Sequence, residues 1–171
     1  DLLRSELLEP LGMNETSLFL SEYQLVNLAP GHDEGLDRVK NYYAQDIFQG
    51  AGFLKSSLHD MLIYLKVQME LTTSILDDAI ALTQQSHLDV GGVHYNDREG
   101  YYNLSIGLAW HIDLLPEGYT FYGHGGRTNG YMAYIGFELT TLTGVVILCN
   151  QSYPEAITRF GEDLLKAVNK H

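Results

Sequence analysis

The stretch Phe121-Tyr-Gly-His-Gly-Gly-Arg-Thr-Asn-Gly130, with Tyr131-Met-Ala-Tyr-Ile-Gly-Phe137 directly after it, decides how this chain folds. Five glycines fall within fourteen residues, and the single histidine His124 lies among them. Apolar runs typical of buried strands flank the stretch. Because glycine carries no side chain, the backbone here can approach another group closely. In a globular enzyme that group is usually a substrate, so the sequence predicts a binding edge.

Size and charge limit what the chain can be. Its 171 residues are enough for one ordinary domain with a sizeable core, so we expect a single domain over 1–171. A content of 45% hydrophobic and 19% charged residues indicates a globular chain. The net charge of −12 argues against a nucleic-acid backbone or an anionic membrane surface as partner.

Cysteine and histidine usage gives no sign of metal chemistry. Cys149 is the only cysteine, so no disulfide can form within the chain, and we interpret it as a small buried hydrophobe. The histidines lack the spacing of metal sites. Apolar runs are shorter than the ~18 residues that a membrane span needs. We expect no metal and no cofactor.

Helical patterns come before strand patterns along the chain. Helices are predicted over 1–11, from 57 onward, over 74–85 and over 154–170. Strands are predicted around 23–28 and over 104–113, 120–124, 132–139 and 144–150, with a polar loop at 86–100. A helical region, consecutive antiparallel strands and a last helix packed on them define an α+β fold.

Several residues have predicted packing or capping roles. Ser56 or Ser57 can cap a helix, and Asp60 completes the [ST]-x-x-[DE] capping box from Ser57. The apolar face of that helix consists of Met61, Leu62, Leu65 and Met69. In the last helix, the positions that suit packing on a sheet are Ile157, Phe160, Leu164, Leu165 and Val168. Core or sheet packing is also the interpretation of Trp110, Tyr122, Tyr131 and Tyr134.

Five short segments occur in a characteristic order and spacing. They are Leu8-Glu-Pro-Leu-Gly-Met-Asn-Glu-Thr-Ser17, Gly50-Ala-Gly-Phe-Leu-Lys-Ser-Ser-Leu-His-Asp60, Ile106-Gly-Leu-Ala-Trp110, His124-Gly-Gly126 and Asn150-Gln-Ser-Tyr-Pro154. Together they resemble the C-terminal half of the serine β-lactamase and penicillin-binding-protein family, above all its class C branch with the related esterases and D-aminopeptidases. The resemblance implies a partial β-lactamase/transpeptidase-like fold.

Two motifs of that family are missing from their expected places. No serine has a lysine three residues later, so the nucleophile motif Ser-x-x-Lys does not occur. Tyr101-Tyr-Asn103 fits the second motif literally, but it follows the helical region, and we interpret it as a coincidence. Since the first residue is Asp1 rather than Met, we expect the C-terminal part of a β-lactamase-like domain, with the N-terminal part absent.

The resemblance assigns roles around the third motif. His124 stands in place of the lysine of the lactamases, and Gly125 in place of the threonine that holds a β-lactam carboxylate. The backbone N–H of Arg127 supplies one of two donors to the oxyanion. Glu155 falls where class C enzymes tend to have an asparagine, and its charge would repel a carboxylate. Substrate-binding roles fall to Gly125, Gly126, Thr128 and Asn129.

Two functions follow as hypotheses. In the first, the chain is the C-terminal portion of a serine hydrolase acting on a small-molecule ester, amide or β-lactam, and it is inactive alone. In the second, it is a non-catalytic fragment or pseudo-enzyme that acts by binding, self-association or pairing with the missing N-terminal part. Family members are commonly exported in bacteria, which implies a periplasmic or extracellular location.

Overall fold

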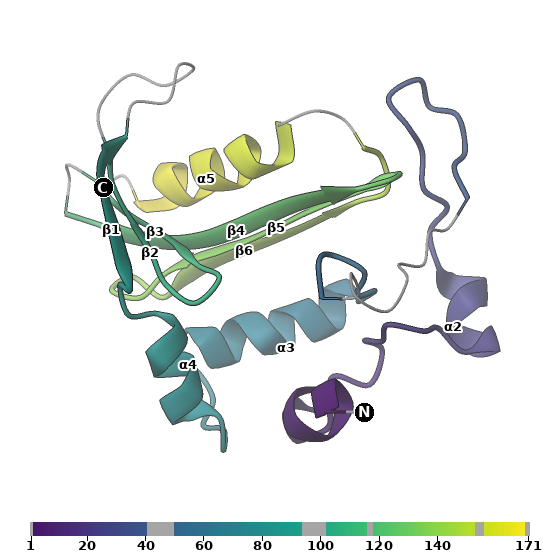
Figure 1. Cartoon of the computed structure of the whole chain (residues 1–171), viewed down its shortest axis with the longest axis horizontal. Helices are drawn as coiled ribbons and strands as arrows, with labels where there is room; N and C mark the ends of the chain where they lie inside the picture. Colours follow the sequence, from purple (N-terminus) through teal and green to yellow (C-terminus); the bar gives the residue numbers. More distant parts are fainter. Residues whose placement is uncertain (1, 41–49, 94–101, 116–117, 153–155, 170–171) are drawn as a thin grey trace.

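The chain folds into an antiparallel sheet with helices on both faces (Figure 1). The computed structural model describes residues 2–40, 50–93, 102–115, 118–152 and 156–169. Within these residues, six strands lie side by side in chain order, β1-β2-β3-β4-β5-β6. Their bounds are β1 Leu88–Val93, β2 Tyr102–Ile106, β3 His111–Leu114, β4 Thr120–Thr128, β5 Tyr131–Glu138 and β6 Thr143–Cys149. This arrangement confirms the predicted α+β fold.

Helices come before the sheet in the chain, and one long helix follows it. Those before it are the π-helical turn η1 (Arg4–Leu8), α1 (Glu9–Leu11), α2 (Glu22–Asn27), α3 (Leu58–Gln68) and α4 (Asp77–Thr83). Helix α5 (Ala156–Asn169) follows β6. In Figure 1, α3 lies below the sheet and α5 above it, so the sheet is the middle layer. No helix among the described residues is long and apolar enough to cross a membrane.

The core between α3 and the sheet is built around aromatic rings. Leu65 and Met69 of α3 are buried in the same cluster as Trp110 and Phe137. The Trp110 and Phe137 rings meet edge to face with centroids 5.1 Å apart, and Tyr122 stacks on Phe137 at 5.1 Å. Both geometries are favourable for aromatic pairs. Trp110 and Tyr122 are therefore packing residues, as predicted.

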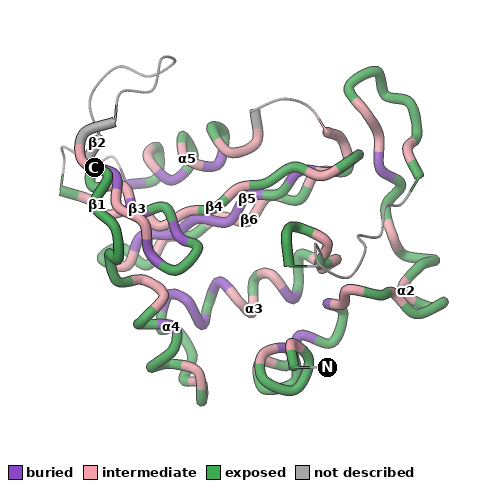
Figure 2. The backbone as a smooth tube through the Cα atoms, in the orientation of Figure 1, coloured by how far each residue is buried: buried purple, intermediate pink, exposed green. Residues whose placement is uncertain are grey.

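The packing of α5 on the other face depends on one tyrosine surrounded by glycines. Tyr134 of β5 is 3% exposed. A Cβ at Gly136 would lie 2.5 Å from the Tyr134 hydroxyl, and a Cβ at Gly123 would lie 2.7 Å from it. On the helix, a Cβ at Gly161 would collide with the same ring. The helix can approach the sheet because these three positions lack side chains. Figure 2 shows the buried residues concentrated along β5, with others at intervals along α3 and α5.

A buried carboxylate joins the N-terminal segment to α3. Asp60 is 1% exposed and accepts hydrogen bonds from the Glu15 N–H (2.8 Å) and the Thr16 hydroxyl (2.7 Å). Its own N–H donates to the Ser57 hydroxyl at 3.2 Å, which caps the helix. The predicted capping box is thus half formed. Ser57 caps α3, but the Asp60 carboxylate is used for the long-range contact instead.

The predicted strand around Tyr23–Leu28 is wrong, because these residues form helix α2. The Gln24 N–H donates to the Ser21 hydroxyl (3.3 Å), and the Ser21 N–H donates to the Gln24 side chain (2.9 Å). This reciprocal capping box satisfies the first backbone donors of a helix. It outweighs the β-propensity of Tyr23 and Val26.

The sheet also corrects several predicted boundaries. The polar loop at 86–100 contains β1, whose pairing with β2 is interrupted by a bulge between Asp89 and Gly91; residues 94–100 lie outside the described part. The single strand predicted over 104–113 is two strands, because Gly107–Trp110 forms a turn in which the Gly107 N–H donates to the Trp110 carbonyl (2.8 Å). Strand β4 does not end at His124 but continues to Thr128.

The helices differ from prediction in which residues they bury. Helix α4 is shorter than the predicted 74–85, and Leu62 of α3 is 40% exposed. In α5, Leu165 is 1% exposed, because the side of the helix that faces the sheet runs through Gly161 and Leu165. Three of the residues predicted to pack on the sheet are instead exposed: Phe160 (55%), Leu164 (38%) and Val168 (54%). The N-terminal helix ends at Gly12 as predicted, with φ 74°.

Replacing Gly161 tests the close approach of α5 to the sheet. Alanine is favoured over glycine inside a helix by roughly 1 kcal/mol. We nevertheless expect Gly161→Ala to lower the free energy of unfolding by about 1–3 kcal/mol, since its methyl group overpacks against the Tyr134 ring. Urea unfolding measures the change. Gly126→Ala is the control, because no atom lies within 4 Å of its Cβ position, and a Gly161→Ala variant as stable as that control would contradict this packing.

Candidate active site

The glycine-rich stretch forms the part of β4 that extends beyond its neighbour β3. The register between β3 and β4 ends at His111 and Gly123, whereas β4 stays paired with β5 as far as Thr128. Within the described residues, no strand pairs with residues 124–128 on the β3 side. An extended ligand could therefore use this edge to form backbone hydrogen bonds. The sequence predicted a binding edge here, and the backbone has the form that such an edge needs.

His124 is the first residue of β4 beyond the β3 register, and a second histidine lies beside it. The rings of His111 and His124 have centroids 5.6 Å apart and are tilted by 42°. Burial lowers the pKa of His124, and the neighbouring His111 lowers it further. Because the pKa lies below its ordinary value, His124 is mostly neutral at pH 7. It can then donate and accept hydrogen bonds, but it carries little charge.

The two glycines after His124 have different surroundings. A Cβ at Gly125 would collide with the Thr158 hydroxyl of α5 and lie 3.3 Å from the Thr158 Cβ. By contrast, no atom lies within 4 Å of a Cβ built on Gly126. Packing of α5 therefore requires a small residue at Gly125. Nothing in the described structure requires one at Gly126, which leaves open space beside the strand there.

The last residues of β4 line an open pocket of about 520 Å³ together with a loop from the first quarter of the chain. The Arg127 guanidinium lies 3.5 Å from the Glu34 carboxylate, with both side chains more than half exposed. An exposed pair of this kind contributes ~0–1 kcal/mol to stability, so it can rearrange when a ligand binds. The lining residues are Asp33, Glu34, Gly35, Arg127, Thr128, Asn129 and Ser152.

The loop that carries Asp33 and Glu34 is held at the end of the sheet by hydrogen bonds to β5 and to the residue that follows β6. The His32 N–H donates to the Asn150 carbonyl (2.9 Å), the Asn150 side chain donates to the Pro30 carbonyl (2.8 Å), and the Tyr131 hydroxyl donates to the Ala29 carbonyl (2.7 Å). Gly130 adopts φ 86°, and a Cβ there would lie 3.1 Å from the backbone of residue 31. The loop and the β4–β5 turn therefore form one unit.

Sequence reasoning missed this loop, which it treated as irregular. The Asp33 carboxylate accepts hydrogen bonds from the N–H groups of Gly35 and Asp37, both at 2.9 Å. An aspartate two residues before a glycine is a recognisable turn signal. That signal predicts the tight tip of the loop. It does not predict that the tip lies against β4, because this contact spans about ninety residues of sequence.

The structure brings together the predicted site residues on β4, from His124 to Thr128, with Asn129 in the turn after it. Glu155 and Tyr101 lie outside the described residues. Cys149 ends β6 as a free, half-buried thiol. In the part of the chain that the structure describes, no three His, Cys, Asp or Glu side chains are grouped to hold a metal ion.

Solved structures share this fold. The β-lactamase/D-alanine carboxypeptidase from Pseudomonas syringae matches with a TM-score of 0.78 and 20% identity, covering 98% of this chain and 51% of that one. A class C β-lactamase from Rhodobacter sphaeroides gives a TM-score of 0.73 at 19% identity, over 89% of this chain and 49% of that one. The octameric penicillin-binding protein homologue from Pyrococcus abyssi gives 0.71 at 27% identity, over 97% and 37% respectively. The fold is thus a partial β-lactamase/transpeptidase-like fold.

Sequence comparison identifies the family. A family model described as Beta-lactamase matches residues 1–170. A β-lactamase of Pseudomonas fluorescens is 25% identical over an alignment of 187 residues, which covers 91% of this chain and 49% of that protein. The chain belongs to the β-lactamase family, and it spans about half the length of this relative.

Removing His111 tests the electrostatic coupling of the two histidines. We expect His111→Gln to raise the pKa of His124, because a neighbouring positive charge disfavours protonation, although burial keeps the pKa below its ordinary value. Titration of the imidazole signals by NMR measures the change. His59→Gln, on the exposed side of α3, is the control and should leave the pKa unchanged. An unchanged pKa in His111→Gln would mean that burial alone lowers it.

Proposed function

We propose that this chain is the C-terminal part of a β-lactamase-related serine hydrolase and supplies the strand that binds the substrate acyl group. The observation that carries the proposal is the free edge of β4 from His124 to Thr128, with open space beside Gly126. The family membership and the half-length match to the relatives support it. Acyl transfer or hydrolysis of an ester, an amide or a β-lactam is the proposed reaction.

In this proposal the chain binds and orients the acyl group while the nucleophile comes from a segment outside it. As the serine oxygen attacks the acyl carbon, the carbonyl oxygen gains negative charge. The backbone N–H of Arg127 donates to that oxygen, and the second donor comes from the nucleophile's own residue. Gly126 leaves room for the acyl group beside the strand. Thr128 and Asn129 contact the part of the substrate that enters the pocket.

The charges near the site favour substrates without a carboxylate. His124 is mostly neutral at pH 7 because burial and His111 lower its pKa, so it attracts an anion less than a lysine would. Arg127 already has Glu34 as its ion-pair partner, and Asp33 adds a second carboxylate to the pocket. A substrate anion would therefore compete with Glu34 and meet repulsion from Asp33. An uncharged ester or amide avoids both costs.

Two substitutions at Arg127 separate its backbone from its side chain. The assay uses the protein with the residues that precede Asp1 in its gene, and p-nitrophenyl acetate as substrate. We expect Arg127→Pro to lower kcat by about 10²–10³, because proline removes the N–H donor. Arg127→Gln keeps the donor and is expected to stay within a few-fold of the unchanged protein.

The reverse order, with Arg127→Gln the more damaging variant, would contradict the oxyanion role of the backbone. Urea unfolding of both variants checks that each is folded. The unchanged 171-residue chain should hydrolyse the ester no faster than buffer, since it contains no Ser-x-x-Lys motif. Saturable turnover by this chain alone would contradict its dependence on an outside nucleophile.

The alternative function, a module that acts by association, is favoured by a different observation. Strand β6 ends the sheet, and within the described residues nothing pairs with its outer edge. The three exposed apolar residues of α5, Phe160, Leu164 and Val168, recur every four residues and form one stripe. A free edge strand and an apolar stripe are both common sites of association. We propose self-association, or pairing with the N-terminal part, through these surfaces.

Charged residues on the α5 stripe test this association. We expect sedimentation velocity to show that the unchanged chain forms dimers or larger species at high concentration, and that Phe160→Glu with Leu164→Glu makes it monomeric. The stripe is exposed, so the variant should remain folded. Ile75→Glu, at an 85% exposed position away from α5, is the matched control and should not change the association. A monomeric unchanged chain would contradict self-association.

A further inference from the structure

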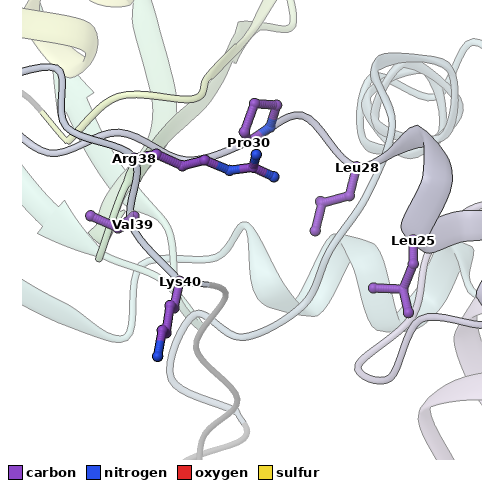
Figure 3. A pocket seen from close by; sticks show the side chains of 6 residues that line it. All are labelled: Leu25, Leu28, Pro30, Arg38, Val39 and Lys40. Atoms are coloured by element: carbon purple, nitrogen blue, oxygen red, sulfur yellow. The ribbon is translucent and has the colours of Figure 1, made fainter.

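A second pocket, beside α2, has a different character from the pocket next to Arg127. Its volume is about 340 Å³, within the range of small-molecule sites. One wall comes from α2 and the segment after it, and the other from the chain between residues 38 and 40 (Figure 3). The lining residues are Leu25, Leu28, Pro30, Arg38, Val39 and Lys40.

The first wall is apolar. Leu25 lies on α2 and is 42% exposed, while Leu28 follows the helix in an extended conformation. In Figure 3 the Leu28 side chain points into the space between the walls. The Ser21–Gln24 capping box fixes the start of the helix and thereby the place of Leu25. Apolar surface left open in this way gains free energy when a hydrocarbon group covers it.

The second wall carries two positive charges, and no carboxylate of the described residues pairs with either. Arg38 and Lys40 are both exposed, and neither forms an ion pair with any described residue. The Arg38 guanidinium extends toward Pro30 and Leu28 in Figure 3. The chain has only 10 basic residues against 22 acidic ones. Two basic side chains without a described ion-pair partner, at a pocket with no acidic residue among its described lining, therefore favour an anionic ligand.

The segments that carry Pro30 and Val39 are held against the sheet before any ligand binds. The Val39 N–H donates to the Gly31 carbonyl (2.9 Å), and the Pro30 carbonyl accepts from the Asn150 side chain (2.8 Å). A Cβ at Gly31 would lie 2.6 Å from the Tyr131 ring, so this segment packs directly on β5. Backbone that is fixed in this way loses little conformational entropy on binding.

We propose that this pocket binds a small amphipathic anion. Arg38 holds a carboxylate or phosphate head group, Lys40 adds positive charge to the same wall, and Leu25, Leu28 and Pro30 cover a short alkyl tail. A cation would be repelled by the two basic side chains, and an uncharged alkyl group would use only the apolar wall. Ligand charge and ligand tail should therefore both contribute to affinity. None of the lining residues belongs to the β4 edge.

Isothermal titration of the 171-residue chain with matched eight-carbon probes tests the proposal. We expect octanoate to bind at least about tenfold more tightly than 1-octanol, and octylammonium to bind more weakly than either. Raising the salt concentration should weaken the binding of octanoate, since both cations are exposed to solvent. Octyl phosphate binding more tightly than octanoate would assign the head group as a phosphate, and the opposite order would assign a carboxylate.

Substitutions locate the bound probe. Arg38→Gln should weaken octanoate binding about tenfold, and Lys40→Gln should weaken it less, because the Lys40 side chain points away from Arg38 in Figure 3. Leu25→Ser should weaken the binding of octanoate but not of acetate. Arg4→Gln removes the same charge from an exposed helix and should leave the affinity within about twofold. Gly126→Val fills the space beside β4 and should have no effect.

Three results would overturn the proposal. One is equal affinity for octanoate and 1-octanol. Another is unchanged octanoate binding in the combined Arg38→Gln and Lys40→Gln variant. The third is loss of binding in Gly126→Val with retention in Arg38→Gln, which would place the octanoate on the β4 edge instead. Urea unfolding of each variant confirms that a lost affinity is not a lost fold.

Discussion

The contact between the Tyr134 ring and the glycines around it sets the position of α5, and much of the molecule depends on that position. With side chains at Gly123, Gly136 or Gly161, the helix would have to move away from the sheet. The same approach brings Thr158 against Gly125, beside His124. The packing of α5 on its face of the sheet therefore fixes the position of β4 at the free edge. Core packing and the geometry of the candidate site are consequences of one arrangement, because close-packed interiors transmit small shifts.

The glycine-rich stretch thus has two physical explanations that a single sequence pattern combines. The packing of α5 and of the Tyr134 ring requires glycine at positions 123, 125 and 136. The turn requires Gly130, whose φ is 86°. Gly126 alone has neither cause within the described structure. It lies on the part of β4 that β3 leaves unpaired, where a substrate would bind. Most of the glycines that suggested a binding site are therefore explained by packing, and only Gly126 remains for the proposed role in binding.

Local sequence patterns predicted the features that depend on neighbouring residues alone. The periodicity of apolar residues predicted β5, β6 and α5 within a few residues, and of the two predicted caps of α3, Ser56 and Ser57, the structure has Ser57. Predictions were wrong where a few hydrogen bonds outweigh the pattern, as at the Ser21–Gln24 box that makes a helix of an expected strand. The strand expected over 104–113 was divided for a similar reason, by the turn at Gly107. In the site, the predicted strand ended at His124, so the part of β4 from Gly125 to Thr128 was not predicted as strand. The place of the loop carrying Asp33 and Glu34 was not predicted either, since only the folded chain brings it to Arg127.

The different surroundings of the glycines also bear on how a site of this kind can change over evolutionary time. Substitution at Gly123, Gly136 or Gly161 affects the core, so new side chains there carry a cost in stability. A new side chain at Gly126 meets no atom of the described structure within 4 Å. It would alter the shape of the proposed acyl-binding edge without disturbing the sheet beneath. The fold thereby separates a position free to vary, Gly126, from the positions that maintain the scaffold, although Gly123 lies only three residues away on the same strand.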